Sequence, residues 1–216
     1  MPAAVMTEVG SMPRNQLIIF DCDGVLVDSE PLANGLLEAA LLPYFGRDAK
    51  RMTENSIGRS FADIRQQIEQ RLPDELPQDF WTQLQSNTLS ALSDTLQPDP
   101  ALRGLLEGLT VPICVASSGS HEKIRTSLAA AQLLDLFDRA IFSAEDVVRG
   151  KPAPDLFLLA AQRHHVSPKD CLVIEDSIPG LEAARAAGMT ALHFVPNEFH
   201  LEPGQINQLH TLTEHL

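Results

Sequence analysis

Five short apolar runs place the strongest constraint on how this chain can fold. Runs of only a few residues, without polar alternation, are typical of strands buried on both faces of a parallel sheet. Between the later runs, apolar residues recur at helical spacing over 121–134, 155–164 and 178–187. Strands that alternate with helices predict an α/β fold with a doubly wound parallel sheet, a Rossmann-like core. The five runs are 17–20, 112–116, 140–142, 171–174 and 190–194.

The long interval after the first run predicts an inserted unit. About ninety residues separate the first run from the second, far more than the ~12 residues that a βαβ crossover needs. The interval is helical in character, so we expect an inserted α-helical cap domain. Its candidate helices span 31–45, 60–72 and 77–92, with turn signals at Pro43, Gly46, Pro73, Pro77, Pro98 and Pro100. The expected boundaries are 31–96 for the cap, and 1–30 with 97–216 for the core.

The composition argues against several classes of partner. A formal net charge of −13 opposes a general nucleic-acid binder, which needs a basic face. No apolar run approaches the ~20 residues of a membrane span, and residues 1–10 lack the pattern of a secretory signal. The odd cysteine count, Cys22, Cys114 and Cys171, fits buried thiols in a reducing compartment. We therefore expect a cytoplasmic protein, a monomer or weak dimer, without nucleic-acid or membrane partners.

Acidic pairs follow two of the apolar runs. Asp21-Cys22-Asp23-Gly24 follows the first run, and Glu175-Asp176-Ser177 follows the fourth. A turn or a helix cap would account for either pair alone. Ligands bind beyond the carboxyl ends of strands in open α/β sheets. If the two strands are neighbours, these carboxylates form an oxygen-rich site that suits Mg²⁺.

Two further segments carry groups that could bind phosphate. The second run ends in Ser117-Ser118-Gly119-Ser120 before a helix, and hydroxyls and amides at a helix N-terminus can cradle a phosphate. Simple helix capping is the alternative. Lys151 lies between Gly150 and Pro152, on a loop that the proline stiffens. It could balance a phosphate beside carboxylates, although a solvated surface lysine is the commoner case.

The order Asp-x-Asp, Ser, Lys, Glu-Asp resembles the haloacid dehalogenase-like hydrolase superfamily. Asp21 to Ser29 looks like its first motif, Ser117 its second, Lys151 its third and Glu175-Asp176 its fourth. The stretch 175–188, EDSIPGLEAARAAG, is similar to the phosphoglycolate phosphatase and β-phosphoglucomutase branch. A helical cap after the first motif also suits that branch.

The resemblance implies a magnesium-dependent phosphatase that acts on a small phosphorylated metabolite. Asp21 would form an aspartyl-phosphate, and Asp23 would act as general acid and base. Ser117 and Lys151 would hold the phosphoryl oxygens. Substrate contacts are expected from main-chain amides near Cys22, Ser118 and Gly119. The expected magnesium ligands are Asp21, Asp176 and the main-chain carbonyl of Asp23, with Glu175 binding through water.

The cap is expected to select the substrate. In similar proteins a loop like 55–60 reaches over the active site, so Arg59 is a candidate contact to the remote part of the substrate, and a solvent-facing arginine is the alternative. Ser120 and His121 are further candidates. A sugar phosphate or a phospho-sugar acid is the leading expectation, with phosphoglycolate and a nucleotide monophosphate open.

The closest alternative activity is that of a β-phosphoglucomutase-like mutase. Mutases of this kind carry a cap-side histidine where this chain has Ala33, which favours hydrolysis. Phosphonate hydrolysis needs a cap lysine, and Lys50 is the only lysine of the cap. Dehalogenases lack the aspartate at the position of Asp23. A phospho-receiver domain has neither the Asp-x-Asp pair nor a long cap, and a non-catalytic role would fit only a degenerate site.

Overall fold

The fold is built around a sheet of six parallel strands in the order β3-β2-β1-β4-β5-β6. The computed structural model describes residues 15–54, 59–72, 75–137, 139–196, 198 and 200–214. The first five strands confirm the five predicted runs, and β1 lies between β2 and β4. The strands are β1 Leu17–Phe20, β2 Ile113–Ser117, β3 Ile141–Ser143, β4 Cys171–Glu175, β5 Thr190–Phe194 and β6 Gln205–Ile206.

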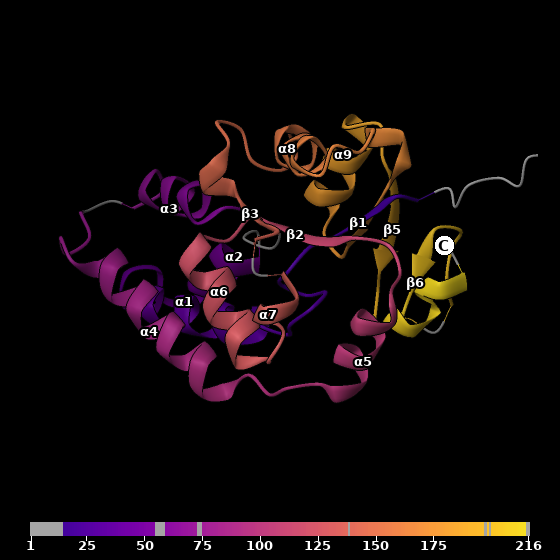
Figure 1. The fold of residues 1–216 in the computed structure, drawn as a ribbon. Helices are drawn as coiled ribbons and strands as arrows, with labels where there is room; N and C mark the ends of the chain where they lie inside the picture. The colour runs from indigo at the N-terminus through magenta and orange to yellow at the C-terminus, as the bar shows by residue number, and fades with distance from the viewer. Residues whose placement is uncertain are drawn as a thin grey trace, which may run out of the picture.

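Helices cover both faces of the sheet, as Figure 1 shows. One face carries α5 (Pro100–Gly108), α6 (His121–Ala130) and α7 (Leu134–Phe137), and the other carries α8 (Asp155–Arg163) and α9 (Ile178–Ala186). This arrangement confirms the doubly wound α/β prediction. Short 3₁₀ segments are η1 Gly46–Asp48, η2 Ala144–Asp146, η3 Pro168–Asp170 and η4 Leu209–Glu214.

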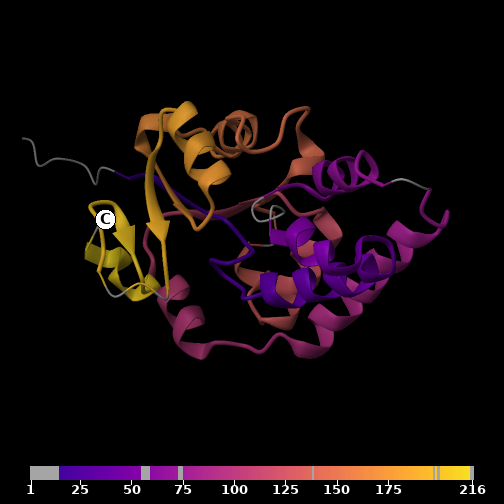
Figure 2. The same ribbon diagram turned by 180° about the vertical axis from the view of Figure 1, so that it is seen from behind.

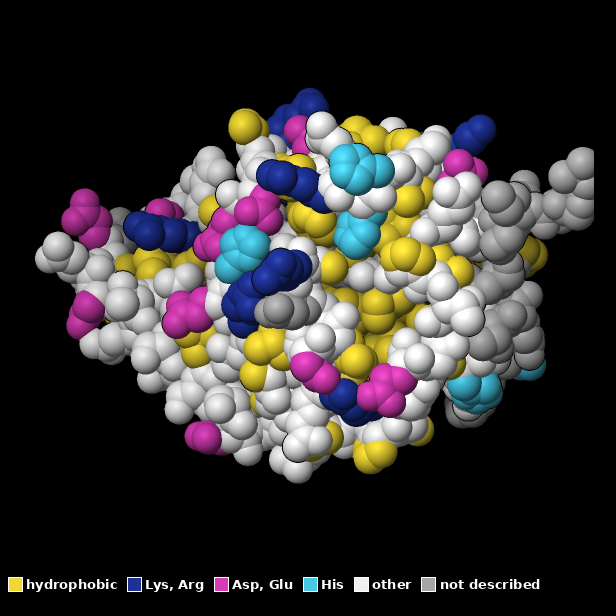
Figure 3. Space-filling model, viewed as in Figure 1, with side chains coloured by type: hydrophobic (Ala, Val, Ile, Leu, Met, Phe, Trp, Pro, Cys, Tyr) yellow, Lys and Arg dark blue, Asp and Glu magenta, His cyan; other side chains and the backbone are white. Residues whose placement is uncertain are grey.

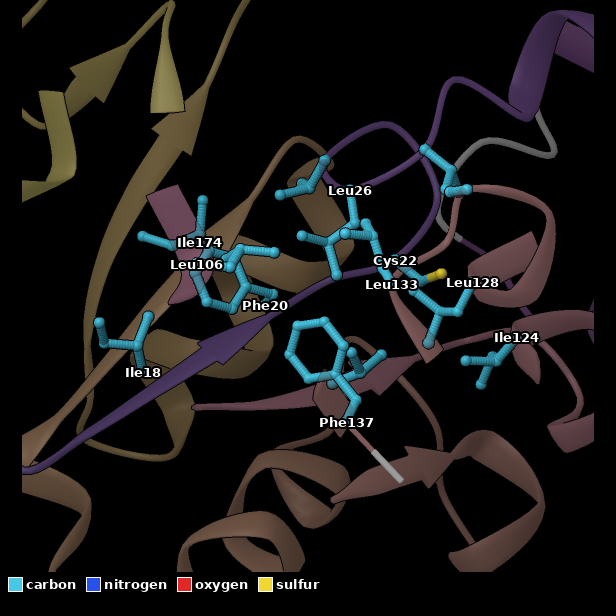
Figure 4. Packing of buried hydrophobic residues seen from close by; sticks show 14 of the residues in the cluster. Ile18, Phe20, Cys22, Leu26, Leu106, Ile124, Leu128, Leu133, Phe137 and Ile174 are labelled. Atoms are coloured by element: carbon cyan, nitrogen blue, oxygen red, sulfur yellow. The ribbon is translucent and has the colours of Figure 1, made fainter. Parts of the chain in front are cut away.

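The central strand β1 is buried on both faces, which explains its uninterrupted apolar sequence. Successive side chains of a strand point to opposite faces. Ile18 and Phe20 therefore pack against α5, α6 and α7, where the Phe137 ring meets the Phe20 ring edge-on (Figure 4). Leu17 and Ile19 face α8 and α9. All four side chains are fully buried, so β1 fixes the position of the residues that follow it.

In the described part of the segment that follows β1, four helices share an apolar cluster of their own. They are α1 Glu30–Phe45, α2 Ala49–Glu54, α3 Phe61–Glu69 and α4 Phe80–Thr95. Their buried residues include Leu41, Ile68 and Trp81. The Trp81 ring packs edge-on against Phe61, and its indole N–H donates to Glu69. Figures 1 and 2 place these helices at the end of the molecule opposite β6, which confirms the inserted helical region.

The structure corrects several predicted boundaries. The helix expected over 121–134 ends at Ala130, because Gln132 adopts a positive φ of 57° that breaks the helix before α7. Pro100 begins α5 rather than a turn, since proline suits the first helical position, where its missing N–H costs nothing. Pro43 lies inside the last turn of α1. The two-residue strand β6 and the short helix α2 escaped prediction, because neither is long enough to show a period.

Two expectations drawn from composition can be compared with the structure. Cys22, Cys114 and Cys171 are all free and buried, as predicted. Among the described residues, no helix has the length and apolar character that crossing a bilayer would require.

Candidate active site

The carboxyl ends of β1 and β4 place three of the predicted residues in direct contact. Lys151 Nζ lies 2.7 Å from Asp21 Oδ1 and 2.6 Å from Glu175 Oε1. The Lys151 side chain is only 1% exposed, and its ammonium also lies 5.0 Å from the centre of the Phe157 ring. Burial lowers the pKa of Lys151, but Asp21 and Glu175 outweigh burial and raise it, so the lysine stays charged. Lys151 is thus a fixed buried cation and not a surface lysine.

A cluster of three carboxylates is the best candidate metal site of the described residues. Oxygens of Asp21, Glu175 and Asp176 lie within 4.8 Å of one another. The pKa of Asp21 rises to about 7 because burial and the neighbouring carboxylates outweigh the effect of Lys151. The pKa of Asp176 rises to about 9 through burial, Asp21 and Glu175. Within the described chain no cationic side chain pairs with Asp176.

This donor set fits a divalent cation such as Mg²⁺. The cation binds carboxylate oxygens by preference, and its charge would offset the burial and the carboxylate repulsion that raise the pKa values of Asp21 and Asp176. Two glycines make room for the carboxylates. A Cβ on Gly24 would lie 2.0 Å from Asp176 Oδ2, and a Cβ on Gly180 would lie 1.8 Å from Glu175 Oε1. Gly24 also has a φ of +82°, a conformation that favours glycine.

Asp23 contacts a lysine and a serine that do not contact Asp21. Lys123 Nζ lies 2.8 Å from Asp23 Oδ2, and the Ser29 hydroxyl donates to Asp23 Oδ1. Burial raises the pKa of Asp23, but the charge of Lys123 and the hydrogen bonds from Lys123 and Ser29 outweigh burial and lower it. Its carboxylate faces the same cavity as Asp21.

The serine loop after β2 faces the same cavity. Ser117 is 1% exposed, and its hydroxyl accepts a hydrogen bond of 3.1 Å from the Gly119 amide. Ser120 caps α6 by accepting from the Lys123 amide. The Ser143 hydroxyl, at the end of β3, donates to the Gly119 carbonyl at 2.7 Å. The loop therefore both caps α6, through Ser120, and lines the cavity, through all four residues 117–120.

His121, the residue that follows the serine loop, does not line the cavity. Its ring lies 2.9 Å from Asp146 Oδ1, and its amide donates to Glu145. Over the start of α6 and the segment after β3, Figure 3 shows acidic, basic and histidine side chains interspersed. His121 thus ties the serine loop to η2.

The cavity lies between the strand ends and the inserted helices. Its floor includes Asp21, Asp23, Lys151 and the serine loop. Its cap side carries the neutral polar residues Asn34, Gln85 and Thr88, and Arg59 and Ala33 also line it. Residues 55–58 of the predicted substrate loop lie outside the described residues.

The structure brings together nearly all of the predicted site residues. Two of them do not line the cavity with their side chains. Cys22 is fully buried in the core cluster around Phe20 (Figure 4), and Asp176 lies beside Asp21 but is not a lining residue. The residues brought to the cavity are Asp21, Asp23, Arg59, Ser117, Ser118, Gly119, Lys151 and Glu175.

Sequence reasoning missed Lys123 and Glu30. Lys123 is the third residue of α6, where a positive charge opposes the helix dipole. That local conflict was a detectable signal, because residues that break a local rule are often functional. Glu30 begins α1 and lines the cavity. Burial and the charge of Asp23 raise its pKa, but the sequence offered no sign of these surroundings.

Comparison with known proteins identifies the family of this chain. A family model for the haloacid dehalogenase-like hydrolases matches residues 16–188. The chain is 36% identical over 182 residues to a probable pseudouridine-5'-phosphatase of Drosophila melanogaster, covering 79% of this chain and 78% of that protein. It is 32% identical over 176 residues to the fructose-1-phosphate phosphatase YqaB of Escherichia coli, covering 81% and 94%. It is 30% identical over 194 residues to a bifunctional riboflavin kinase/FMN phosphatase of Arabidopsis thaliana. That match covers 85% of this chain but only 50% of the length of the relative.

Solved structures share the fold. A haloacid dehalogenase-like protein of unknown function from Agrobacterium tumefaciens superposes with a TM-score of 0.73 at 30% identity, covering 93% of this chain and 97% of that one. A putative β-phosphoglucomutase from Thermotoga maritima shares the fold at 23% identity, with a TM-score of 0.71 and coverage of 93% and 99%. The resemblance seen in the motifs is confirmed: the chain belongs to the haloacid dehalogenase-like hydrolase family and is a phosphatase, a phosphoric monoester hydrolase.

Proposed function

We propose that this protein is a Mg²⁺-dependent phosphatase that hydrolyses a small phosphorylated metabolite through an aspartyl-phosphate on Asp21. The observation that carries the proposal is the contact of Asp21 with buried Lys151, beside the carboxylates of Glu175 and Asp176. A carboxylate held next to a fixed cation can approach an anionic phosphate, which free carboxylates repel.

The chain's residues suggest the following roles. Asp21 attacks phosphorus while Asp23 gives a proton to the departing alcohol oxygen. In the second half, Asp23 takes a proton from water, and the water oxygen attacks phosphorus and frees Asp21 and inorganic phosphate. Ser117, Lys151 and the amides near Ser118 and Gly119 hold the phosphoryl oxygens throughout.

The proposed metal ligands are Asp21, Asp176 and the Asp23 carbonyl, with Glu175 binding through water. Bound Mg²⁺ would screen the repulsion between the attacking carboxylate and the dianionic phosphate. Glu175 has a second function, because its Oε2 accepts a 2.6 Å hydrogen bond from the Ser177 amide. It thereby connects Lys151 to the start of α9.

The leading substrate class is a sugar phosphate or a phospho-sugar acid. Asn34, Gln85 and Thr88 on the cap side offer neutral donors and acceptors for substrate hydroxyls. The name of the fructose-1-phosphate phosphatase relative points to the same class. Arg59 lines the cavity and is the candidate contact for the remote group. Ala33, at the position of the mutase histidine, lines the cavity too, which supports hydrolysis over mutase activity.

We also propose a division of the chain into two units. Residues 31–96 form the cap, and 1–30 with 97–216 form the core. The separate apolar cluster of α1, α3 and α4 supports the division.

The test is phosphate release from a panel of phosphorylated metabolites, with Mg²⁺ and with EDTA. Wild type should release phosphate only with Mg²⁺, and Asp21→Asn should lose at least about 10²-fold in kcat while keeping its circular dichroism spectrum. Asp94→Asn is the matched control, because Asp94 is exposed on α4 and does not line the cavity, so it should keep wild-type activity. Substantial turnover by Asp21→Asn, or full activity in EDTA, would refute the proposal.

A further inference from the structure

We infer that Lys123 is a positioning residue that holds Asp23 in the orientation needed for proton transfer. The inference rests on the proposed function of Asp23 as general acid and base. It adds a residue from α6, outside the four motifs that carry the family resemblance.

The contacts fix both oxygens of the Asp23 carboxylate. Lys123 Nζ lies 2.8 Å from Oδ2, and the Ser29 hydroxyl donates to Oδ1. The two side chains are shielded, with 25% of Lys123 and 16% of Asp23 exposed. An ion pair shielded from water is stronger and better oriented than one on the surface. A carboxylate held at both oxygens cannot rotate freely, so its face toward the cavity is set before substrate arrives.

The position of Lys123 in its helix supports this function. It is the third residue of α6, and its amide donates to the capping hydroxyl of Ser120. A lysine in the first turn opposes the helix dipole, so it brings no benefit to α6 itself. The carboxylate of Asp23, 100 residues earlier in the chain, accounts for the lysine being there.

Each of the two lysines that line the cavity contacts a different aspartate. Lys151 contacts Asp21 and Glu175, whereas Lys123 contacts Asp23. Lys123 lies on α6, which packs against the cap helix α4. It therefore stands where the core meets the cap, and it lines the cavity beside Asp23.

The test compares aryl phosphates of similar size whose leaving groups differ in acidity. 4-Nitrophenolate leaves without a proton, whereas phenolate departs faster when an acid protonates it. We expect Lys123→Met to lose about tenfold or more in kcat/KM with phenyl phosphate and less than about threefold with 4-nitrophenyl phosphate. Lys123→Arg should recover most of the loss. Lys169→Met, an exposed lysine of η3, is the matched control and should behave as wild type with both.

A double-mutant cycle with the best substrate separates positioning from substrate binding. If Lys123 acts through Asp23, Lys123→Met in the Asp23→Asn background should cost less than about twofold further. Independent, multiplying losses would overturn the inference, as would equal losses with both aryl phosphates. A wild type that releases no phosphate would instead overturn the proposed function and this inference with it, so the two failures are distinguishable.

Discussion

At the scale of single residues, the site depends on close approach between a helix and a buried carboxylate. Glu175 is fully buried and is held by Lys151 on one oxygen and by the Ser177 amide on the other. The first turn of α9 crosses this carboxylate at Gly180. Only a residue without a Cβ leaves the space that the carboxylate occupies, so the glycine there is a packing requirement.

We expect Gly180→Ala to destabilise the protein by about 1–3 kcal/mol, as overpacking in a tight interior does, and to reduce phosphate release. The new Cβ would displace Glu175 and with it Lys151. Urea unfolding and the phosphate assay together measure the effect. Gly104→Ala is the control, because Gly104 lies in α5 with no atom near its missing Cβ. It should gain about 0.5–1 kcal/mol, and a similar gain in Gly180→Ala would contradict the packing argument.

At the scale of elements, helix N-termini are held by side chains that end the preceding loops. Ser120 and Ser177 cap α6 and α9, the helices that begin at the site. Asp99 caps α5, accepting from the Ala101 and Leu102 amides at 2.9 and 3.1 Å. Capping thus fixes where the chain turns from the site into each helix.

Asp99→Ala should cost about 1 kcal/mol of unfolding free energy, because two amides lose their acceptor. Chemical denaturation measures the cost. Asp79→Ala is the paired control, since Asp79 precedes α4 but makes no cap hydrogen bond, and it should cost less than about 0.5 kcal/mol. Equal costs would show that the hydrogen-bonded cap does not stabilise α5.

At the scale of the whole molecule, the site concentrates charge that the fold must tolerate. Four carboxylates, Asp21, Asp23, Glu175 and Asp176, face two ammonium groups, those of Lys123 and Lys151. The site therefore carries excess negative charge when all are ionised. A bound divalent cation would neutralise that excess and stabilise the folded state.

Mg²⁺ should raise the melting temperature of wild type by about 5 °C or more at roughly 100 times its Kd. Asp176→Asn should lose most of this rise, because a proposed ligand becomes a neutral amide. Differential scanning fluorimetry with and without Mg²⁺ measures both, independently of activity. An undiminished rise in the variant would remove Asp176 from the metal site.

The raised pKa of Asp176 predicts that the stability of the metal-free protein depends on pH. This pKa of about 9, against an ordinary value of 3.8, means that the folded chain keeps a proton that the unfolded chain has lost. Between these pH values this group's contribution to stability falls as pH rises. The metal-free melting temperature should therefore fall less in Asp176→Asn than in wild type from about pH 5 to about pH 8. Parallel pH curves for the two proteins would argue against the raised pKa.

The separate apolar cluster of the inserted helices also predicts local stability. Leu41→Ala should cost about 2–5 kcal/mol within that unit, because Leu41 is fully buried there. Hydrogen exchange should speed up in α1 and α4 while β1 amides stay protected. Leu156→Ala, in the cluster that covers β1, should speed up exchange of the β1 amides while α1 and α4 stay protected. Uniform loss of protection in Leu41→Ala would show one cooperative unit instead of two.

The sequence by itself determined the fold class and the composition of the site. Buried parallel strands need continuous apolar runs, and β1 to β5 carry them. The proposed catalytic groups come after successive strands in chain order, so Asp21, Ser117, Lys151 and Glu175 could be proposed from motifs alone. The family resemblance rested on those same residues, and the strand neighbours β1 and β4 bring the two acidic pairs together as expected.

Only the tertiary structure decided which groups touch. The pairing of Lys123 with Asp23 joins residues 100 positions apart, and the pattern of α6 gives no sign of its partner. The requirement for glycine at position 180 could not be read from the sequence either, because a missing Cβ matters only where another element packs against it. The end of α6 at Ala130, where Gln132 soon adopts a positive φ, and the two-residue strand β6 were not visible in the local sequence pattern either. Local patterns record burial and periodicity, whereas contacts between distant segments are set by how the elements pack.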